Sequence, residues 1–418
     1  MEATLFVNGH VWDGVRDARV LADLLVQGER IAGLSRQPGE FSGVSARRID
    51  AQGATLIHGL VDAHGHLSFP MVTYPTEIED TPPEESVLIT MHNARTLLDA
   101  GFTGVIGAGS PKLRTELVVR NEITAGRIPG PRILASTPTL TATGGLNDTA
   151  QPHQGRAVAA LVVDGPVEMR RAIRTCYREG VDVVKLNISG DDFFPRPGGR
   201  VTTLAEDEVQ EAGRTAAELG MLLCAHARSA ESIKRALRAG VTLLHHADFA
   251  DEAALDLLEA ARDRIFVGPT IGYYHALKHE SPLGRDMLDR MGVDAAMAAN
   301  IAVHTELRRR GIRAVIGGDY GLPWQPNGTN ARDVAHFVTY LGYSPVEALR
   351  AATVHGAAAM NLGAGTLETG RLGDVLLIEG DPTNDPAAVA DPRRIRAVMK
   401  GGVFHKTPAP ADRIARAA

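Results

Sequence analysis

The sequence predicts an α/β fold in which a (β/α)8 TIM barrel is joined to a small β-sandwich built from both termini. Between residues 58 and 362, short apolar runs alternate with segments of helical periodicity, which is typical of parallel strands connected by helices. Both ends of the chain have strand-like stretches without that periodicity. The length of 418 residues exceeds what one hydrophobic core usually organises, so a large domain with a smaller companion is expected.

Residues 1–57 and 363–418 are predicted to form the β-sandwich. Asn8-Gly9 is a typical hairpin-turn signal, and Gly401-Gly402 predicts a second turn. We expect the strands of the two ends to pair beside the barrel. The strand candidates are Thr4–Val7, Val20–Val26, Ile31–Leu34, Val375–Ile378, Ile395–Met399 and Val403–Phe404.

Residues 58–362 are predicted to form the barrel. Capping signals predict helix starts at Thr81–Glu84, Thr203–Glu206 and Ser344–Glu347, and Gly220 suits the end of the second helix. The strand candidates are nearly continuously apolar, as expected of strands buried on both faces. They are Thr55–Val61, Thr103–Ile106, Pro131–Ala135, Val181–Leu186, Met221–Ala225, Val241–Leu244, Ile265–Gly268 and Arg313–Ile316.

The composition, with 44% apolar and 22% charged residues, is that of an ordinary globular protein. A net charge of -6 gives no reason to expect nucleic acid or an anionic membrane as a partner. The two cysteines, Cys176 and Cys224, are too few for a disulfide framework. Neither a signal peptide nor an apolar run long enough to span a bilayer is recognisable. We therefore expect a cytoplasmic protein.

Residue types that commonly bind metals lie at or near the ends of five of the predicted strands. The C-terminal ends of barrel strands meet at one face, so these side chains are expected to lie close together. A single histidine there is usually structural, and an aspartate often caps the next helix, but five strands contributing to one face indicate a metal site. The candidates are His64, His66, Lys185, His226, His245, His246 and Asp319.

Alternation along a strand refines this set. His64 and His66 are one residue apart, so both imidazoles can face one ion. His245 and His246 are neighbours and should point to opposite faces. We expect His246 to be the ligand and His245 to pack outside the barrel.

These residues, with motifs elsewhere, resemble the amidohydrolase superfamily. The resemblance is to the branch that contains prolidase-like dipeptidases and imidazolonepropionase-like proteins, and it covers nearly the whole chain. The further motifs are Leu60–His66 (LVDAHGH), Gly130–Ala135 (GPRILA), Ala142–Gly145 (ATGG), Glu347–Thr353 (EALRAAT) and Gly370–Val375 (GRLGDV).

The resemblance implies a binuclear metal centre. Lys185 would bridge the two ions as a carbamate formed with carbon dioxide, because an ammonium beside two cations would be repelled. Zinc suits the histidine-rich ligation, and manganese, cobalt and nickel are alternatives. The other implied ligands are His64, His66 and Asp319 for the first ion, and His226 and His246 for the second.

The resemblance also implies an activity, the hydrolysis of an amide-type C–N bond by a hydroxide that bridges the ions. Asp319 would be the catalytic proton acceptor and donor. N-acyl amino acids or dipeptides are favoured as substrates, with cyclic amides, ureas and carbamates as alternatives. A mononuclear deaminase is a rival, but such relatives carry a glutamate where this chain has Ser229. A non-enzymatic relative would have lost ligands, and none is missing.

Substrate contacts are expected from the loops, with a small molecule as partner. Arg228 would bind a carboxylate. Many relatives have a histidine where this chain has Leu146, and His153 is the candidate replacement. Residues 190–199 are predicted to form a lid or pocket wall, and a homo-oligomer remains open. The remaining candidates for substrate contact are Tyr273, Tyr274, Tyr320 and Arg332.

Overall fold

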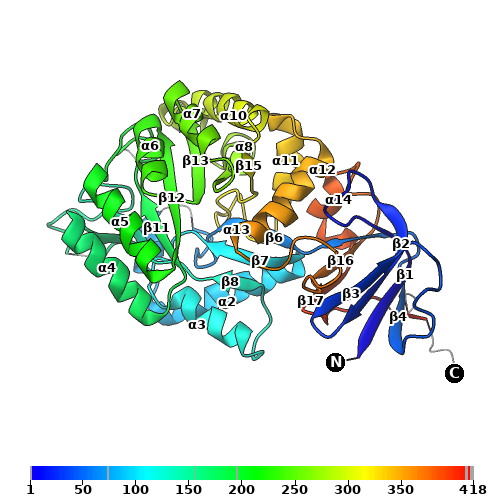
Figure 1. Ribbon diagram of the computed structural model, residues 1–418. Coiled ribbons are helices and arrows are strands. Elements are labelled where there is room, and N and C mark those ends of the chain that lie inside the picture. Colours follow the sequence, from blue (N-terminus) through cyan, green and yellow to red (C-terminus); the bar gives the residue numbers. More distant parts are fainter. Residues whose placement is uncertain (1, 73–74, 156, 194–195, 410–412, 415–418) are drawn as a thin grey trace.

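The computed structural model describes residues 2–72, 75–155, 157–193, 196–409 and 413–414. A barrel of parallel strands, surrounded by helices, lies beside a sheet domain that both termini build (Figure 1). In Figure 1 the sheet domain is coloured blue and orange to red, and the barrel runs from light blue to orange. The predicted fold class is confirmed.

The sheet domain is one connected sheet of nine strands. The strands are β1 (Ala3–Val11), β2 (Val20–Gln27), β3 (Arg30–Ser35), β4 (Ala46–Asp50), β5 (Thr55–His58), β16 (Val375–Ile378), β17 (Ile395–Lys400), β18 (Val403–Lys406) and β19 (Arg413–Ile414). Their order is β18-β17-β16-β5-β1-β2-β3, and β4 pairs with β1 and β19. Antiparallel pairing of β5 with β16 joins the two ends of the chain, as the sequence predicted.

The predicted hairpin turn at Asn8-Gly9 is wrong. Strand β1 runs through both residues, and its register with β2 shifts between Phe6 and Gly9. Asn8 has a left-handed φ of 58°, and a Cβ on Gly9 would lie 2.8 Å from Ala51 Cβ. An irregularity within the strand and close packing, rather than a turn, therefore explain these two residues.

The barrel strands belong to two parallel sheets. The strands are β6 (Leu60–Gly65), β7 (Phe102–Gly107) and β8 (Arg132–Leu134) in one sheet, and β9 (Thr139–Thr141), β10 (Ala160–Val162), β11 (Val183–Asn187), β12 (Leu222–Ser229), β13 (Leu243–Phe249), β14 (Phe266–Gly268) and β15 (Arg313–Ala314) in the other. Each of the eight predicted barrel strands overlaps one of these elements.

Backbone hydrogen bonds join the two sheets at two places. Ala63 N, in β6, donates to Ile316 O just beyond β15 (3.0 Å), and Thr137 N, after β8, donates to Val183 O in β11 (2.9 Å). The barrel strands therefore follow one another around the interior. The C-terminal ends of β6, β11, β12, β13 and β15 consequently meet at one face.

The first predicted barrel strand, Thr55–Val61, is in fact two strands. Its first half is β5, which pairs with β16 in the sheet domain, and its second half opens β6, which pairs with β7 in the barrel. The two meet at Gly59, where a Cβ would lie 2.2 Å from Thr103 Oγ1. Glycine allows the chain to pass between the domains at this crowded point.

Helices cover the outside of the barrel. None in the described ranges is long and apolar enough to cross a bilayer. The helices are α1 (Pro75–Asp80), α2 (Pro83–Asp99), α3 (Thr115–Thr124), α4 (Pro166–Glu179), α5 (Glu206–Leu219), α6 (Ala230–Arg238), α7 (Glu252–Ala260), α8 (Ile271–His279), α9 (Arg285–Arg290), α10 (Val293–Arg309), α11 (Arg332–Leu341), α12 (Pro345–Arg350), a π-helix (Ala351–His355), α13 (Gly356–Ala359), α14 (Ala387–Ala390) and a 3-10 helix (Pro392–Arg394).

Helices begin at all three predicted starts. Ser344 Oγ accepts from Glu347 N (3.2 Å) while the Glu347 carboxylate accepts from Ser344 N (2.7 Å), a capping box that opens α12. Helix α5 begins at Glu206 and ends at Gly220, whose φ is 67°. The capping role predicted for Thr81 is wrong, because α2 is preceded by Pro82 and Thr81 donates its hydroxyl to Glu77 O.

Candidate metal centre

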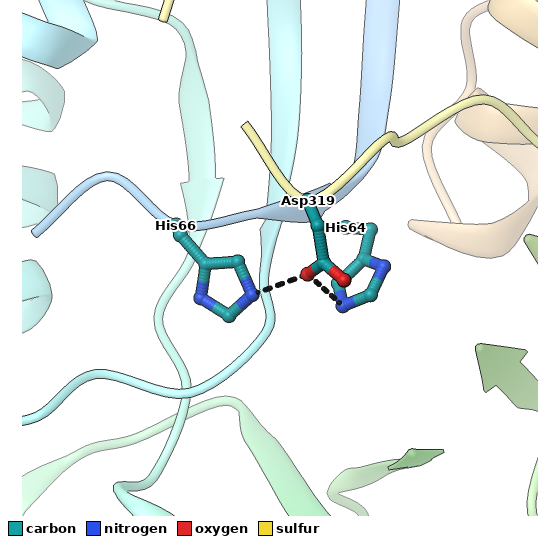
Figure 2. Close-up of side chains that lie close together, drawn as sticks. All are labelled: His64, His66 and Asp319. Carbon is teal, nitrogen blue, oxygen red and sulfur yellow. Dashed lines mark hydrogen bonds and ion pairs between the residues drawn. The ribbon is translucent and has the colours of Figure 1, made fainter. Parts of the chain in front are cut away.

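Two histidines and an aspartate meet where β6 and β15 end. His64 Nε2 lies 3.0 Å and His66 Nε2 lies 2.8 Å from Asp319 Oδ1 (Figure 2). The ligand atoms of the three side chains all lie within 4.8 Å of one another. Figure 2 shows both imidazoles leaving the same strand end, with the carboxylate reaching them from a separate segment. This is the convergence that the sequence predicted for these residues.

The buried carboxylate of Asp62 fixes the end of β6. It accepts hydrogen bonds from His64 N (2.8 Å) and from Asn330 Nδ2 (2.6 Å). Burial raises the pKa of Asp62 to about 7, against its hydrogen bonds, which lower it. Asp62 therefore ties the histidine strand to the segment that precedes α11.

Asp319 itself lies in strained backbone. Its φ is 60°, a left-handed conformation that costs energy for a residue with a side chain. Buried Asp333 secures the backbone on both sides, accepting from Gly317 N (3.1 Å) and from Tyr320 OH (3.0 Å). These bonds hold the loop in the conformation that directs the Asp319 carboxylate at the histidines.

His226 is oriented by a bond to the backbone. Its Nε2 lies 2.9 Å from Gly190 O. A carbonyl oxygen only accepts, so Nε2 carries the proton of the neutral ring, and the lone pair is on Nδ1. The ring centroids of His226 and His246 are 4.4 Å apart, which makes these two histidines adjacent nitrogen donors.

His246 is oriented by a threonine. Its Nδ1 lies 2.7 Å from Thr270 Oγ1, and that hydroxyl donates its own proton to Pro269 O (2.7 Å). His246 must therefore donate from Nδ1, and its lone pair is on Nε2. This Nε2 lies 3.7 Å from Asp319 Oδ2. One predicted ligand of the second ion is thus close to the carboxylate that also contacts His64 and His66.

The prediction that His245 packs outside the barrel is wrong. Its ring is fully buried and stacks on the His64 ring, with centroids 3.7 Å apart and planes 5° apart. His245 Nδ1 lies 2.6 Å from Lys185 Nζ. His246 and Ala247 both have left-handed φ, 77° and 63°, so the alternation of side chains stops at the end of β13. Both neighbouring histidines can then face the interior.

Strand register is the signal that would have found His245. In the parallel pairing of β12 with β13, His226 lies opposite His245. Side chains at paired positions of adjacent strands share a face, so an inward His226 requires an inward His245. The register itself depends on the three-dimensional pairing, which the apolar runs do not specify.

Burial keeps four of the histidines neutral. It lowers the pKa of His64 to about 3 and that of His226 to about 4, and it holds the pKa values of His245 and His246 well below their usual range. Burial opposes ionisation of Asp319, but its interactions with His64 and His66 outweigh this and hold its pKa well below the usual range. Neutral imidazoles beside an ionised carboxylate are the protonation states that a divalent cation requires.

The donor set fits divalent cations. The Nδ1 atoms of His64 and His66 are buried without a hydrogen-bond partner among the described residues. The Nε2 atoms of both rings, which face Asp319, are the nitrogens that would bind an ion. Lys185 is also buried, and burial lowers its pKa, which favours the uncharged amine.

A cavity of about 140 Å³ opens onto these side chains. His64, His66, Lys185, His226 and Asp319 form its floor. Its walls are largely apolar, and polar groups interrupt them at a few positions. The walls are formed by Phe69, Val72, Ile78, Glu79, Ala108, Gly109, Pro111, Thr139, Leu146, Asn147, Ala159, Asn187, Asp191, Phe193, Tyr273 and Leu322.

A sequence profile of the amidohydrolase family matches residues 55–404. The chain belongs to this family. This amidohydrolase is 25% identical to ochratoxinase from Aspergillus niger over an alignment of 313 positions. The alignment covers 69% of this chain and 63%, less than two thirds, of that protein. It is 26% identical to dihydroorotase from Syntrophotalea carbinolica over 417 residues, with 92% of this chain and 91% of that protein covered.

The fold of the amidohydrolase is also similar to solved structures. A prolidase complexed with N-methylphosphonate-L-proline superposes with a TM-score of 0.85 at 26% identity, covering 97% of this chain and 99% of that one. A Xaa-Pro dipeptidase with bound methionine superposes with a TM-score of 0.83 at 25% identity, covering 97% of this chain and 100% of that one.

The residues predicted to contact substrate are distributed unevenly in the amidohydrolase. Tyr273 and Leu146 both line the cavity. His153, the candidate to replace a histidine at position 146, is exposed. It is not one of the described residues that line the cavity. Asp191 and Phe193, from the segment 190–199, form part of the wall. Phe194 and Pro195 of that segment lie outside the described residues.

Three further candidates are engaged with other side chains. Arg332, on α11, forms an ion pair with Glu280. Tyr320 donates to Asp333, and Tyr274 donates to Asp248 (2.7 Å). These contacts hold loops and helices around the site. Among the described residues, none of the three candidates lines the cavity.

Arg228 is buried behind the cavity wall. It forms ion pairs with Asp248 and with Asp191 Oδ2, the latter at 2.7 Å. Only 2% of its side chain is exposed. A guanidinium already facing two carboxylates is neutralised, so the structure gives Arg228 a role in holding the site together.

Proposed function

We propose that the protein is a binuclear metal-dependent amidohydrolase that cleaves an amide-type C–N bond. The position of Asp319 between two sets of nitrogen donors carries this proposal. Its Oδ1 lies within 3.0 Å of His64 Nε2 and His66 Nε2, and its Oδ2 lies 3.7 Å from His246 Nε2. A carboxylate that adjoins both sets suits two cations in one site. His64, His66 and Asp319 would hold one ion, and His226 and His246 the other.

Lys185 would complete the site as a carbamate. Its buried amine can add carbon dioxide, since the lowered pKa favours the uncharged, nucleophilic form. The product carries a negative charge and offers oxygen atoms to both ions. Zinc is the proposed metal because most of the ligands are neutral imidazoles.

Bound divalent ions supply an activated water molecule and polarise the substrate carbonyl. The chain's own contribution is a proton carrier. Ionised Asp319 accepts the proton of the attacking water and returns it to the leaving nitrogen. Protonation of this nitrogen is needed because an amide anion is a very poor leaving group.

The cavity supports an apolar substrate. Phe69, Ile78, Leu146 and Phe193 would surround the group next to the scissile bond. The similarity to a prolidase bound to N-methylphosphonate-L-proline and to ochratoxinase supports a substrate of the dipeptide or N-acyl amino acid type. We propose such substrates with an apolar side chain; neutral cyclic amides, ureas and carbamates are the alternatives.

Metal analysis and a substrate screen test this function. We expect about two divalent ions per chain and metal-dependent cleavage of apolar dipeptides or N-acyl amino acids. Asp319→Asn should keep the fold and lower kcat about 10²- to 10⁴-fold, since it removes the proton carrier. Full activity of this variant would contradict the role of Asp319. Activity on neutral carbamates or cyclic amides alone would contradict the substrate class.

One observation favours a second candidate, a mononuclear hydrolase or deaminase. His64, His66 and Asp319 are the one group of described residues whose ligand atoms lie within 4.8 Å of one another. A single ion could be held by these three side chains. A stoichiometry of one ion per chain in the active enzyme, with release of ammonia from an amino-substituted ring, would establish this alternative.

A further inference from the structure

We propose that His245 is a positioning residue that orients the carbamate of Lys185. The inference rests on the proposed function, because it concerns the modified lysine of that centre. It assigns a role to a histidine that lies beside the six implied ligands without being one of them. The observation that carries it is the contact between His245 Nδ1 and Lys185 Nζ, at 2.6 Å.

The hydrogen bonds of His245 define which of its ring nitrogens can accept a hydrogen bond from Lys185. Its Nε2 lies 3.0 Å from Ala63 O. The carbonyl can only accept, so Nε2 is the protonated nitrogen of the neutral ring. Nδ1 therefore has a free lone pair directed at Lys185. The lysine nitrogen is the donor in this contact.

The ring of His245 cannot turn away from this contact. One of its faces stacks on His64 at a centroid distance of 3.7 Å, with the planes only 5° apart. The bond to Ala63 O ties the opposite edge of the ring to β6. No part of His245 is exposed. The acceptor therefore has a fixed position and a fixed direction.

Carbamate formation leaves one donor on the lysine nitrogen. The amine lone pair forms the N–C bond with carbon dioxide, a C=O π pair moves onto oxygen, and the nitrogen gives up one proton to water. The product, an N-alkyl carbamate, is planar and retains a single N–H. If that N–H points at His245 Nδ1, the plane of the carbamate is set, and so are the directions of its two oxygens. His245 would thereby direct one oxygen to each ion.

Position in the fold supports this assignment. Lys185 is in β11 and His245 is in β13, with β12 between them. Lys185 lies opposite Cys224 in β12, and His226, two residues further along β12, lies opposite His245. His245 therefore lies two residues nearer the C-terminal ends of the strands than Lys185 does. The extended lysine side chain reaches this level.

Acceptor-free and acceptor-retaining variants test the proposal. His245→Phe keeps an aromatic ring beside His64 but removes the acceptor, His245→Leu removes both, and His245→Gln keeps an acceptor oxygen. The carbamate is measured by ¹³C NMR after incubation with ¹³C-bicarbonate and zinc, and bound zinc is measured by titration. Lys185→Ala identifies the carbamate signal, and thermal unfolding identifies variants that do not fold.

We expect the carbamate signal to fall by more than half in the Phe and Leu variants. Apparent zinc affinity should weaken about 10- to 100-fold, as for other partners of metal ligands. The Gln variant should retain most of the signal and the affinity. A purely structural role of the ring would instead be preserved by Phe and lost in Gln.

The outcomes separate this inference from the proposed function. A wild-type protein with the carbamate and two zinc ions, together with folded Phe or Leu variants that keep both, overturns the inference alone. A wild-type protein without the carbamate signal overturns the inference and the binuclear form of the proposed function. Using two acceptor-free variants keeps the test decisive if one of them fails to fold.

Discussion

At the scale of single residues, the orientation of His226 and of His246 depends on a partner outside the ligand set. Thr270 is such a partner, because its hydroxyl accepts from His246 Nδ1 and so leaves the lone pair on Nε2. Thr270→Val removes the acceptor but keeps the branched shape. We expect metal affinity to fall about 10- to 100-fold, measured by zinc titration of the metal-free protein.

Thr353→Val is the matched control for this variant. Thr353 is also a buried threonine, but its hydroxyl donates to Leu349 O within a helical segment. Its removal should leave zinc affinity unchanged. If both variants lost affinity equally, a general effect on packing would replace the specific effect on His246.

The buried carboxyl group of Glu116 should make the stability of the protein depend on pH. Burial raises the pKa of Glu116 from 4.5 to about 7, against its hydrogen bonds from Ser136, which lower it. The folded state therefore holds a proton that the unfolded state releases between these values. The resulting stability is fully present below pH 4.5 and is lost as the pH rises through about 7.

Glu116→Gln isolates this effect. The amide cannot ionise, so from pH 5 to pH 8 the wild type should lose about 2 to 3 kcal/mol of unfolding free energy more than the variant does. Urea unfolding of the metal-free proteins at both pH values measures the difference. Parallel curves for the two proteins would contradict the raised pKa.

At the scale of elements, a buried charge cluster connects the strands to the helices behind the cavity. Arg228, in β12, pairs with Asp248 in β13 and with Asp191 in the segment after β11. Asp248 also accepts from Tyr274 of α8 and from Asn300 of α10. One guanidinium thus compensates two carboxylates that are largely withdrawn from water.

Arg228→Gln should destabilise the fold by about 3 to 5 kcal/mol, because it leaves these carboxylates uncompensated. Urea unfolding measures the loss. The control is Arg214→Gln, whose exposed ion pairs on α5 should contribute less than about 1 kcal/mol. If Arg228 anchored a substrate carboxylate instead, its removal would raise KM and leave stability unchanged.

At the scale of the whole molecule, the two domains share part of their hydrophobic core. Trp12, Ile57 and Leu376 of the sheet domain belong to the same buried cluster as Phe102 and Phe337 of the barrel. Figure 1 shows the sheet domain lying against this side of the barrel. The domains therefore stabilise each other.

Removal of the sheet domain is expected to prevent stable folding of the barrel. A truncated chain of residues 58–362 would lose the partners of the shared core and expose large apolar side chains to water. Circular dichroism and urea unfolding of this fragment should show no cooperative transition. A cooperative transition like that of the full chain would show that the barrel folds independently.

The sequence by itself determined the alternation of strands and helices and the polar residues at the strand ends. These features are local, because an apolar run and its next residue are read from adjacent positions. The strand ends that carry His64, His66 and Asp319 could therefore be recognised, although they are far apart in the chain. The same local reasoning treated the run Thr55–Val61 as one strand, although β5 and β6 divide it, since the pairing of β5 with β16 involves a segment about 320 residues away.

Only the tertiary structure decided which side chains face the site and which are already paired. His245 is turned inward by strand register and by the left-handed backbone that follows it, and neither is visible in an alternating pattern. The sequence predicted that Arg228 binds a substrate carboxylate, but in the fold it pairs with Asp248 and Asp191. The physical reason is the same in both cases: orientation and charge compensation depend on contacts between distant segments, and these exist only once the barrel has closed.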